Sequence, residues 1–126
     1  KGLGDRIPEL GIISDAQLAE WYAAADALVY LPSLSGFGLP VIEAMASGLP
    51  VVCSNTGGVA EVAGGAAWMV NPHDPAEAGR ALAALLTGET HRTTRVRHGL
   101  ARALEYSWHR TAEATLAVYR RVADAA

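Results

Sequence analysis

The chain has 126 residues, of which 51% are hydrophobic, and it carries a net charge of −3 and a single cysteine. This length fits one domain or part of one, and a balanced charge without a basic stripe argues against a nucleic-acid surface. One cysteine excludes an intramolecular disulfide and favours a reducing compartment, while four scattered histidines predict no zinc site. The longest apolar stretch, Trp21–Leu31, is interrupted by Asp26 and is too short to cross a bilayer.

The first predicted elements are a helix and a buried strand. Ser14–Gln17 reads as a capping box, because the serine oxygen can accept from a free helix N–H while the glutamine reaches back. The buried stripe of this helix would consist of Leu18, Trp21, Tyr22 and Ala25, spaced at i, i+3, i+4 and i+7. The apolar run Ala27–Leu31 then predicts a strand that is covered on both faces and ends at Pro32.

The second half of the chain continues this alternation. Val51–Cys53 and Ala66–Val70 are two further apolar strands, and Asp74–Glu77 has the cap, proline and acid that begin a helix. The buried stripe of that helix would consist of Ala78, Ala81, Leu82, Leu85 and Leu86, before Thr87 and Gly88 end it. From Glu89 to Ala126 we expect two more helices, broken near Ser107. The last would carry Trp108, Ala112, Leu116, Tyr119 and Ala123 on one face. Short apolar strands between helices predict an α/β fold with a parallel sheet flanked by helices, and with C-terminal helices.

The most informative segment is Pro32–Ala46, which lies between a strand and a helix. Ligands of parallel α/β sheets bind beyond the carboxyl ends of the strands, where this loop would lie. Gly36 and Gly38 allow close backbone approach, and Pro40 suits the first turn of a helix. Amides at the helix start, around Gly38, Leu39 and Val41, together with the helix dipole predict a phosphate or diphosphate site.

Glu43 lies one turn into the same helix, and helical side chains lean toward the N-terminus. Its carboxylate would repel a phosphate but would accept hydrogen bonds from hydroxyls beside one, such as a ribose diol. The predicted ligand is therefore a nucleotide. Taken singly, the Gly-x-Gly turn also fits a plain tight turn, and Glu43 also fits a solvated helix position.

The whole segment resembles the donor-binding signature of the retaining GT-B glycosyltransferases, the glycosyl transferases group 1 or family 4. That pattern is Glu, Gly-Phe-Gly-Leu-Pro, a second Glu eight positions after the first, and Ala-Met-Ala-x-Gly-x-Pro-Val-Val. The matching residues are Gly36–Pro40, Glu43–Ala46, Gly48 and Pro50–Val52. Further landmarks are Gly4–Ile7 and Leu10–Ile12 as an opening strand, Ala24–Ala27, Thr56–Gly58 with Glu61, Asn71–Asp74, and the tail from Ser107 to Tyr119.

The resemblance implies a Rossmann-like GT-B C-terminal domain over residues 1–126, truncated at its N-terminal side. It implies transfer of a sugar from a nucleotide-diphosphate sugar to an acceptor hydroxyl with retention, without a metal or another cofactor. An absent N-terminal domain would bind the acceptor, which could be a sugar, a lipid or a small molecule. The family's catalytic groups would lie upstream, so no residue of this chain is assigned a catalytic role. We expect the chain alone to be inactive.

The resemblance also assigns donor-binding roles. Glu43 would hold the ribose hydroxyls, and the donor sugar and diphosphate would contact Ser35, Gly36, Phe37, Gly38 and Leu39. Ile12 and Ile13 would flank the nucleobase. We expect a cytoplasmic location, either free or peripheral to the membrane. An uncovered sheet edge would allow the truncated chain to self-associate.

Ser35 is a departure from the family pattern, because it stands where the first glutamate is expected. A charge-assisted hydrogen bond to the donor sugar contributes about 1.5–3 kcal/mol, against about 1 kcal/mol for a neutral one. We therefore expect weaker donor binding or a different sugar preference. Ser35 also leaves open a degenerate module that binds a nucleotide sugar without catalysis. The Phe37–Pro40 signature speaks against an epimerase, and a generic flavodoxin-like domain would not explain the motif.

Several other residues have simpler explanations. Cys53 is expected to pack in the core rather than to react, and Trp21, Trp68 and Trp108 are expected to pack rather than to stack on sugars. Gly57 and Gly58 could either border the donor pocket or form a plain turn. The histidines are expected at the surface.

Overall fold

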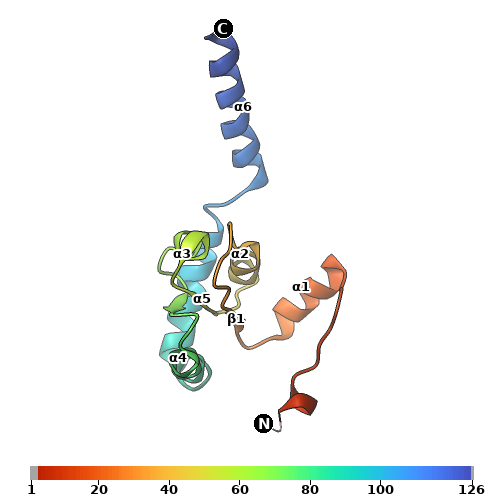
Figure 1. Ribbon diagram of the computed structural model, residues 1–126, viewed down its shortest axis with the longest axis vertical. Coiled ribbons are helices and arrows are strands. Elements are labelled where there is room, and N and C mark those ends of the chain that lie inside the picture. Colours follow the sequence, from red (N-terminus) through yellow and green to blue (C-terminus); the bar gives the residue numbers. More distant parts are fainter. Residues whose placement is uncertain (1–2, 126) are drawn as a thin grey trace.

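The computed structural model describes residues 3–125, except for the side chain of Asp5, so the predicted domain's end residues Lys1, Gly2 and Ala126 lie outside the described residues (Figure 1). The strands are β1 (Leu28–Tyr30), β2 (Val51–Ser54) and β3 (Trp68–Val70). The helices are the 3-10 helix η1 (Gly4–Arg6), α1 (Asp15–Ala24), α2 (Leu39–Ala46), α3 (Gly57–Ala63), α4 (Pro75–Thr87), α5 (Glu89–Ala103) and α6 (Trp108–Asp124).

The three strands form one parallel sheet in the order β1-β2-β3. Leu28 lies opposite Val51, and Val52 lies opposite Trp68. Helix α2 connects β1 to β2, and α3 connects β2 to β3, so each parallel pair has a helical crossover. The predicted α/β class with a parallel sheet flanked by helices is therefore confirmed.

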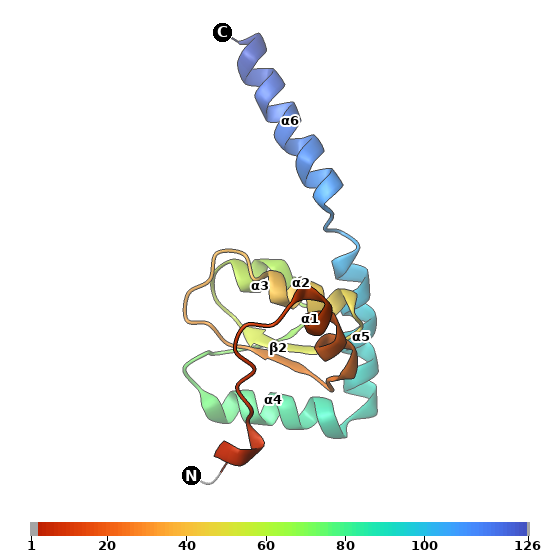
Figure 2. The ribbon, with the colours of Figure 1, turned by 90° about the vertical axis from the view of Figure 1, so that its right-hand side faces the viewer.

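Helices cover both faces of the sheet, and the central strand β2 is buried along its whole length (Figure 2). Because side chains of a strand alternate between its faces, β2 contributes to two cores. Val51 and Cys53 pack with residues of α2 and α3 on one face, and Val52 packs with Ala81 and Leu85 of α4 on the other. This double burial explains why β2 reads as an unbroken apolar run.

Helix α5 fastens the layer formed by α2 and α3. A Cβ atom on Gly99 of α5 would lie 3.1 Å from Cγ of Met45, so the two helices approach closely at this glycine. Arg102 reaches the carboxyl end of α3, where its Nε donates to the carbonyl of Val62 at 2.9 Å and its Nη2 to the carbonyl of Glu61 at 2.8 Å. The last carbonyls of α3 are thus satisfied by a cation from α5.

The N-terminal region corrects the predicted opening strand. Residues 4–12 form η1 and an extended coil that runs to α1 apart from the sheet (Figure 1). A strand needs a partner to hydrogen-bond with, and this arm does not run beside β1. The predicted buried stripe of α1 is also wrong in part: no residue of α1 is buried, and Trp21 is 47% exposed.

Helix α3 was not predicted, because its seven residues begin with two glycines and give a weak helical signal. Helix α4 has the predicted cap, with the Glu77 amide donating to Oδ1 of Asp74 at 2.9 Å. Its stripe is confirmed at Ala81 and Leu85, but Leu86 is 52% exposed. The capping box at Ser14 is also confirmed.

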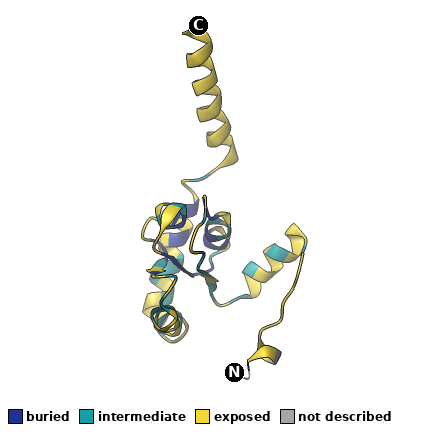
Figure 3. Cartoon of the chain, viewed as in Figure 1, coloured by how far each residue is buried: buried dark blue, intermediate teal, exposed yellow. Residues whose placement is uncertain are grey.

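Helix α6 extends away from the rest of the chain and has no buried residue (Figure 3). The predicted break at Ser107 is confirmed, since its side chain accepts a hydrogen bond from the Arg110 amide. The predicted packing of this face is wrong within the described residues: Trp108 is 78% exposed and Tyr119 68%. Periodicity identified an apolar face, but the described elements do not cover it.

Of the three tryptophans, Trp68 alone packs against a core cluster. Within residues 3–125 no helix is long and apolar enough to span a membrane.

Candidate functional site

The loop between β1 and α2 lies where the motif predicted it, beyond the carboxyl end of a parallel strand. Gly38 is buried and takes a left-handed conformation, with φ of 90°, immediately before α2. Pro40 lies in the first turn. The Val41 amide donates to the Gly38 carbonyl at 3.0 Å, so the prediction that this amide points outward to a ligand is wrong. Leu39 is the first helical residue, so its amide has no acceptor in a preceding turn of α2. This arrangement leaves a helix start that can bind an anion.

The same loop packs against the start of α3. A Cβ atom on Gly58 would lie 1.9 Å from the Gly36 carbonyl oxygen, and one on Gly38 would lie 3.0 Å from Cγ2 of Val59. The starts of α2 and α3 therefore converge, and glycine at position 58 is what allows the contact. Gly58 is not a plain turn residue: it forms the surface on which the loop rests.

A serine in β2 holds the beginning of the loop. Ser54 is completely buried, and its hydroxyl donates to the Pro32 carbonyl at 2.7 Å. Ser35 is half-buried, and its Oγ lies 3.5 Å from the hydroxyl of Tyr30, where either group can donate. The position that carries a carboxylate in the family pattern is thus occupied here by two neighbouring hydroxyl groups.

Phe37 and Leu39 remain at the surface, with exposed fractions of 45% and 44%. The Phe37 ring meets the ring of Tyr106 edge to face, with centroids 5.7 Å apart. Tyr106 lies between α5 and α6 and accepts a hydrogen bond from Nη2 of Arg102 at 2.8 Å. No local pattern in the sequence indicates this contact, because its two rings are far apart along the chain.

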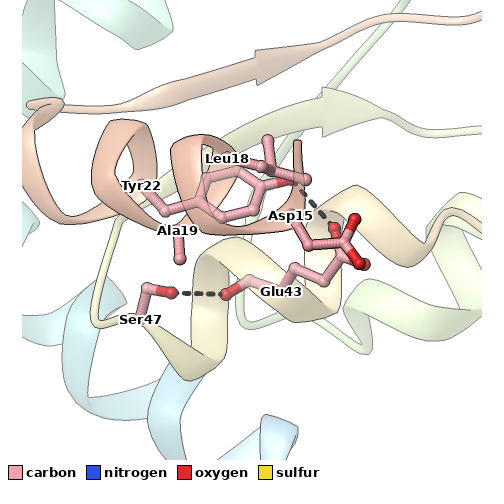
Figure 4. Close-up of a pocket in the computed structure, with 6 residues that line it drawn as sticks. All are labelled: Asp15, Leu18, Ala19, Tyr22, Glu43 and Ser47. Atoms are coloured by element: carbon pink, nitrogen blue, oxygen red, sulfur yellow. Dashed lines mark hydrogen bonds between the residues drawn. The ribbon is translucent and has the colours of Figure 1, made fainter. Parts of the chain in front are cut away.

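Glu43 lines a cavity of about 280 Å³ between α1 and α2 (Figure 4). The other lining residues are Asp15, Leu18, Ala19, Tyr22 and Ser47. Two carboxylates and no basic side chain line this cavity, so it disfavours phosphate and suits hydroxyl donors. The side chain of Leu18 and the ring of Tyr22 form an apolar wall on one side of the cavity. Its size is at the lower end of small-molecule sites.

Tyr22 is a site residue that sequence reasoning placed only in a packing stripe. Its hydroxyl donates to Oε2 of Glu43 at 3.0 Å, as Figure 4 shows. Burial, followed by the hydrogen bond to Glu43, raises the pKa of Tyr22 to about 12, so the phenol remains a donor at neutral pH. A usable signal was its place four residues after Leu18 and seven after Asp15, which puts all three on one face of α1.

The predicted nucleobase residues lie on the arm before α1. The side chain of Ile12 is fully exposed and that of Ile13 is half-buried. Asp15, two residues after Ile13, lines the Glu43 cavity, so the arm leads directly to it. Ser35–Leu39 lie at the amino end of α2, and Glu43 lies one turn farther along α2, beside α1. The role of Ile12 and Ile13 at a nucleobase stays a prediction.

The predicted burial of Cys53 and the predicted exposure of the histidines agree with the structure. Cys53 is fully buried, and burial raises the pKa of its thiol to about 11, which fits packing rather than reactivity. All four histidines are exposed. Within the described residues, no cluster of three or more His, Cys, Asp or Glu side chains could hold a metal ion.

Comparison with known proteins shows the family of this chain. The model of the family "Glycosyl transferases group 1" matches residues 1–88. The chain is 37% identical over 111 residues to O-antigen chain mannosyltransferase B of Escherichia coli, covering 88% of this chain and 29% of that protein. It is 38% identical over 125 residues to MMP alpha-(1->4)-mannosyltransferase of Mycolicibacterium hassiacum, covering 95% of this chain and 30% of the other.

A solved structure shows the same fold. Sucrose-phosphate synthase from Thermosynechococcus elongatus superimposes with a TM-score of 0.88 and 31% identity, over 98% of this chain and 32% of that one. The fold is thus that of a Rossmann-like domain of the GT-B type. The chain belongs to the glycosyl transferases group 1 family. It spans about three tenths of the length of these relatives.

Proposed function

We propose that this chain binds a nucleotide-diphosphate sugar as part of a glycosyltransferase active site. In this proposal the diphosphate and sugar rest against Ser35–Leu39, and the ribose hydroxyls bind Glu43. The supporting observation is the division of charge along α2. The helix start offers amides and the positive end of the dipole, whereas the cavity at Glu43 is acidic.

The spacing of these two parts suits adjacent groups of one nucleotide. Leu39 and Glu43 lie four residues apart, which is about 6 Å along a helix and places both on one face. An anion at the helix start and a diol at the carboxylate would then be neighbours. The arm at Ile12 and Ile13 leads to the same cavity, which makes it the candidate surface for the base.

The reaction we propose is transfer of the sugar to an acceptor hydroxyl with retention of anomeric configuration. Positive dipoles, rather than a metal ion, would stabilise the departing diphosphate. The acceptor, a sugar, a lipid or another small molecule, would bind to a further domain. Both relatives described above are mannosyltransferases, which agrees with a sugar-transfer reaction. We also propose a cytoplasmic location. Turnover by the full-length protein that is unchanged in excess EDTA would support metal independence.

The test is calorimetric titration with UDP-, GDP- and ADP-sugars. Glu43→Gln is expected to weaken the preferred donor about tenfold or more, because a charge-assisted hydrogen bond becomes neutral. Glu113→Gln on the remote helix α6 is a matched control and should bind within about twofold of the parent. Equal binding by Glu43→Gln and the parent would refute this assignment of the ribose site.

Ser35 supports a second candidate, a module that binds nucleotide sugars without transferring them. The hydroxyl pair of Ser35 and Tyr30 replaces a charged acceptor, which weakens one contact to the sugar. The full-length protein distinguishes the two candidates. Turnover with the donor that binds tightest supports the enzyme, and tight binding without turnover or hydrolysis supports the module.

We also propose that the chain can associate with itself. Strand β1 is an edge of the sheet, and Val29 within it is 45% exposed. Sedimentation velocity over a range of concentrations tests this. A single species with the mass of one chain at every concentration would rule it out.

A further inference from the structure

The contact between Tyr22 and Glu43 joins two elements that are not adjacent in the chain. Tyr22 lies near the end of α1 and packs against the core cluster formed in part by residues of α2 and α3. Its hydroxyl donates to Oε2 of Glu43 at 3.0 Å, across the cavity drawn in Figure 4. In the part of the chain that the structure describes, no other side-chain hydrogen bond reaches this carboxylate.

Glu43 by itself is poorly suited to hold a ligand in one geometry. It is an exposed residue with three rotatable side-chain bonds, and a free glutamate samples several rotamers. A vicinal diol requires both carboxylate oxygens at fixed positions. Tyr22 has only two rotatable bonds before its ring, and core packing holds that ring in place. A hydrogen bond from the Tyr22 hydroxyl therefore restricts the rotamers that the Glu43 carboxylate can adopt.

The contact leaves the carboxylate able to bind. Tyr22 takes one lone pair of Oε2, so Oε1 and the second lone pair of Oε2 stay available. Asp15 lies on the same cavity and adds a second acceptor rather than a competing cation. The arrangement resembles the way outer hydrogen-bonding partners orient the ligands of other binding sites.

We propose that Tyr22 is a positioning residue, which fixes the Glu43 carboxylate in the orientation that accepts the vicinal diol of a ribose. This inference rests on the proposed function, in which Glu43 receives the ribose hydroxyls. It adds that the selectivity for a diol depends on a residue of α1 as well as on the motif in α2.

Two other roles for the contact predict different results. If Tyr22 only ties α1 to α2, its hydroxyl should matter equally for ligands with and without the diol. If Tyr22 blocks Glu43, removal of its hydroxyl should tighten binding of the diol. A positioning role alone predicts that the loss is confined to ligands that carry the diol.

The experiment compares UDP, GDP and ADP with their 2′,3′-dideoxy counterparts by calorimetry. Tyr22→Phe keeps the packed ring and is expected to weaken the best nucleoside diphosphate about fivefold or more. The dideoxy counterpart of that nucleoside diphosphate should bind to Tyr22→Phe with an affinity within about twofold of its affinity for the parent chain. Tyr119→Phe, a fully comparable change on the exposed face of α6, should alter neither affinity. In a Glu43→Ala background, Tyr22→Phe should have no further effect.

The outcomes separate the two proposals. A parent chain that binds UDP, GDP and ADP no better than their dideoxy counterparts overturns the ribose role of Glu43, and the role of Tyr22 with it. A parent chain that prefers the diol, with Tyr22→Phe weakening both ligands equally or neither, overturns only the positioning role. Thermal melting monitors folding, and a variant with a broadened, non-cooperative melt counts against positioning and for a structural tie.

Discussion

The Cα atom of Gly58 approaches the carbonyl oxygen of Gly36 so closely that a Cβ atom on Gly58 would lie 1.9 Å from that oxygen. The two residues belong to different crossovers, one before α2 and the other at the start of α3. The loop between β1 and α2 therefore rests directly on a backbone, without an intervening side chain. Any residue larger than glycine at position 58 must displace either this loop or the start of α3.

Gly58→Ala is accordingly expected to destabilise the chain by about 2 kcal/mol or more, because the obstructing atom is backbone and cannot rotate away. Gly79→Ala is the matched control. Gly79 lies inside α4 with open space around its Cβ position, so alanine there should stabilise the chain by about 0.5–1 kcal/mol. Urea denaturation followed by circular dichroism measures both. A Gly58→Ala variant as stable as the parent would contradict the close contact.

Ser35→Glu restores the acidic side chain that the family pattern has at this position. We expect it to change the affinity for the donor sugar or the order of preference among UDP-, GDP- and ADP-sugars in the full-length protein. The added charge can accept from a sugar hydroxyl or from the Tyr30 hydroxyl nearby. Competition binding with each donor measures the change. Unchanged affinities and turnover across several donors would count against a role for position 35.

Cys53 is expected to make stability depend on pH at the alkaline side. Burial raises the pKa of its thiol from 9.0 to about 11. As the pH rises, the thiol therefore ionises in the unfolded chain before it ionises in the folded chain. The contribution of the protonated, buried thiol to the free energy of unfolding is fully present below pH 9 and is lost between pH 9 and 11. It amounts to about 2–3 kcal/mol.

Urea denaturation at pH 8 and at pH 10.5 measures this loss, and Cys53→Ala should reduce the difference between the two. Tyr22 contributes in the same direction but at higher pH, because its pKa is raised from 10.0 to about 12. The native thiol should also resist a disulfide reagent at pH 8 until urea is added. Rapid labelling of the folded chain would be inconsistent with the buried position.

Helix α6 is expected to be the least protected helix in hydrogen exchange. It has 17 residues, none of them buried, and most of the stability of a helix in a protein comes from packing against other elements. Its amides should exchange orders of magnitude faster than those of β2, which is buried throughout. Exchange measured by mass spectrometry tests this in the 126-residue chain. Equal protection of α6 and β2 would show that the apolar face of α6 is covered in solution.

The sequence was informative wherever one local cause determines the structure. The start of α2 could be predicted because Gly38 and Pro40 each favour one backbone geometry there. The central strand could be predicted because Val51–Cys53 is buried on both faces, which requires an uninterrupted apolar run. The start of α4 followed in the same way from a single cap residue, Asp74.

The failures concern contacts between distant parts of the chain. A strand exists only beside a partner, and the residues before α1 do not run alongside the sheet, so the opening strand taken from the family resemblance was wrong. The apolar face of α6 was visible in the sequence, but what covers that face was not. The contact between Tyr22 and Glu43 spans 21 residues, and neither residue type by itself indicates the other.

The attachment of Arg102 to α3 has a consequence for the loop between β1 and α2. A helix of seven residues cannot hold itself together, and its carboxyl end depends on a guanidinium group that comes about 40 residues later in the chain. The amino end of that same helix is the surface on which Gly36 rests. Arg102 is not itself a predicted donor-binding residue, and its partner Tyr106 contacts Phe37. A substitution at Arg102 would therefore weaken the support of the loop while leaving every residue of the motif unchanged.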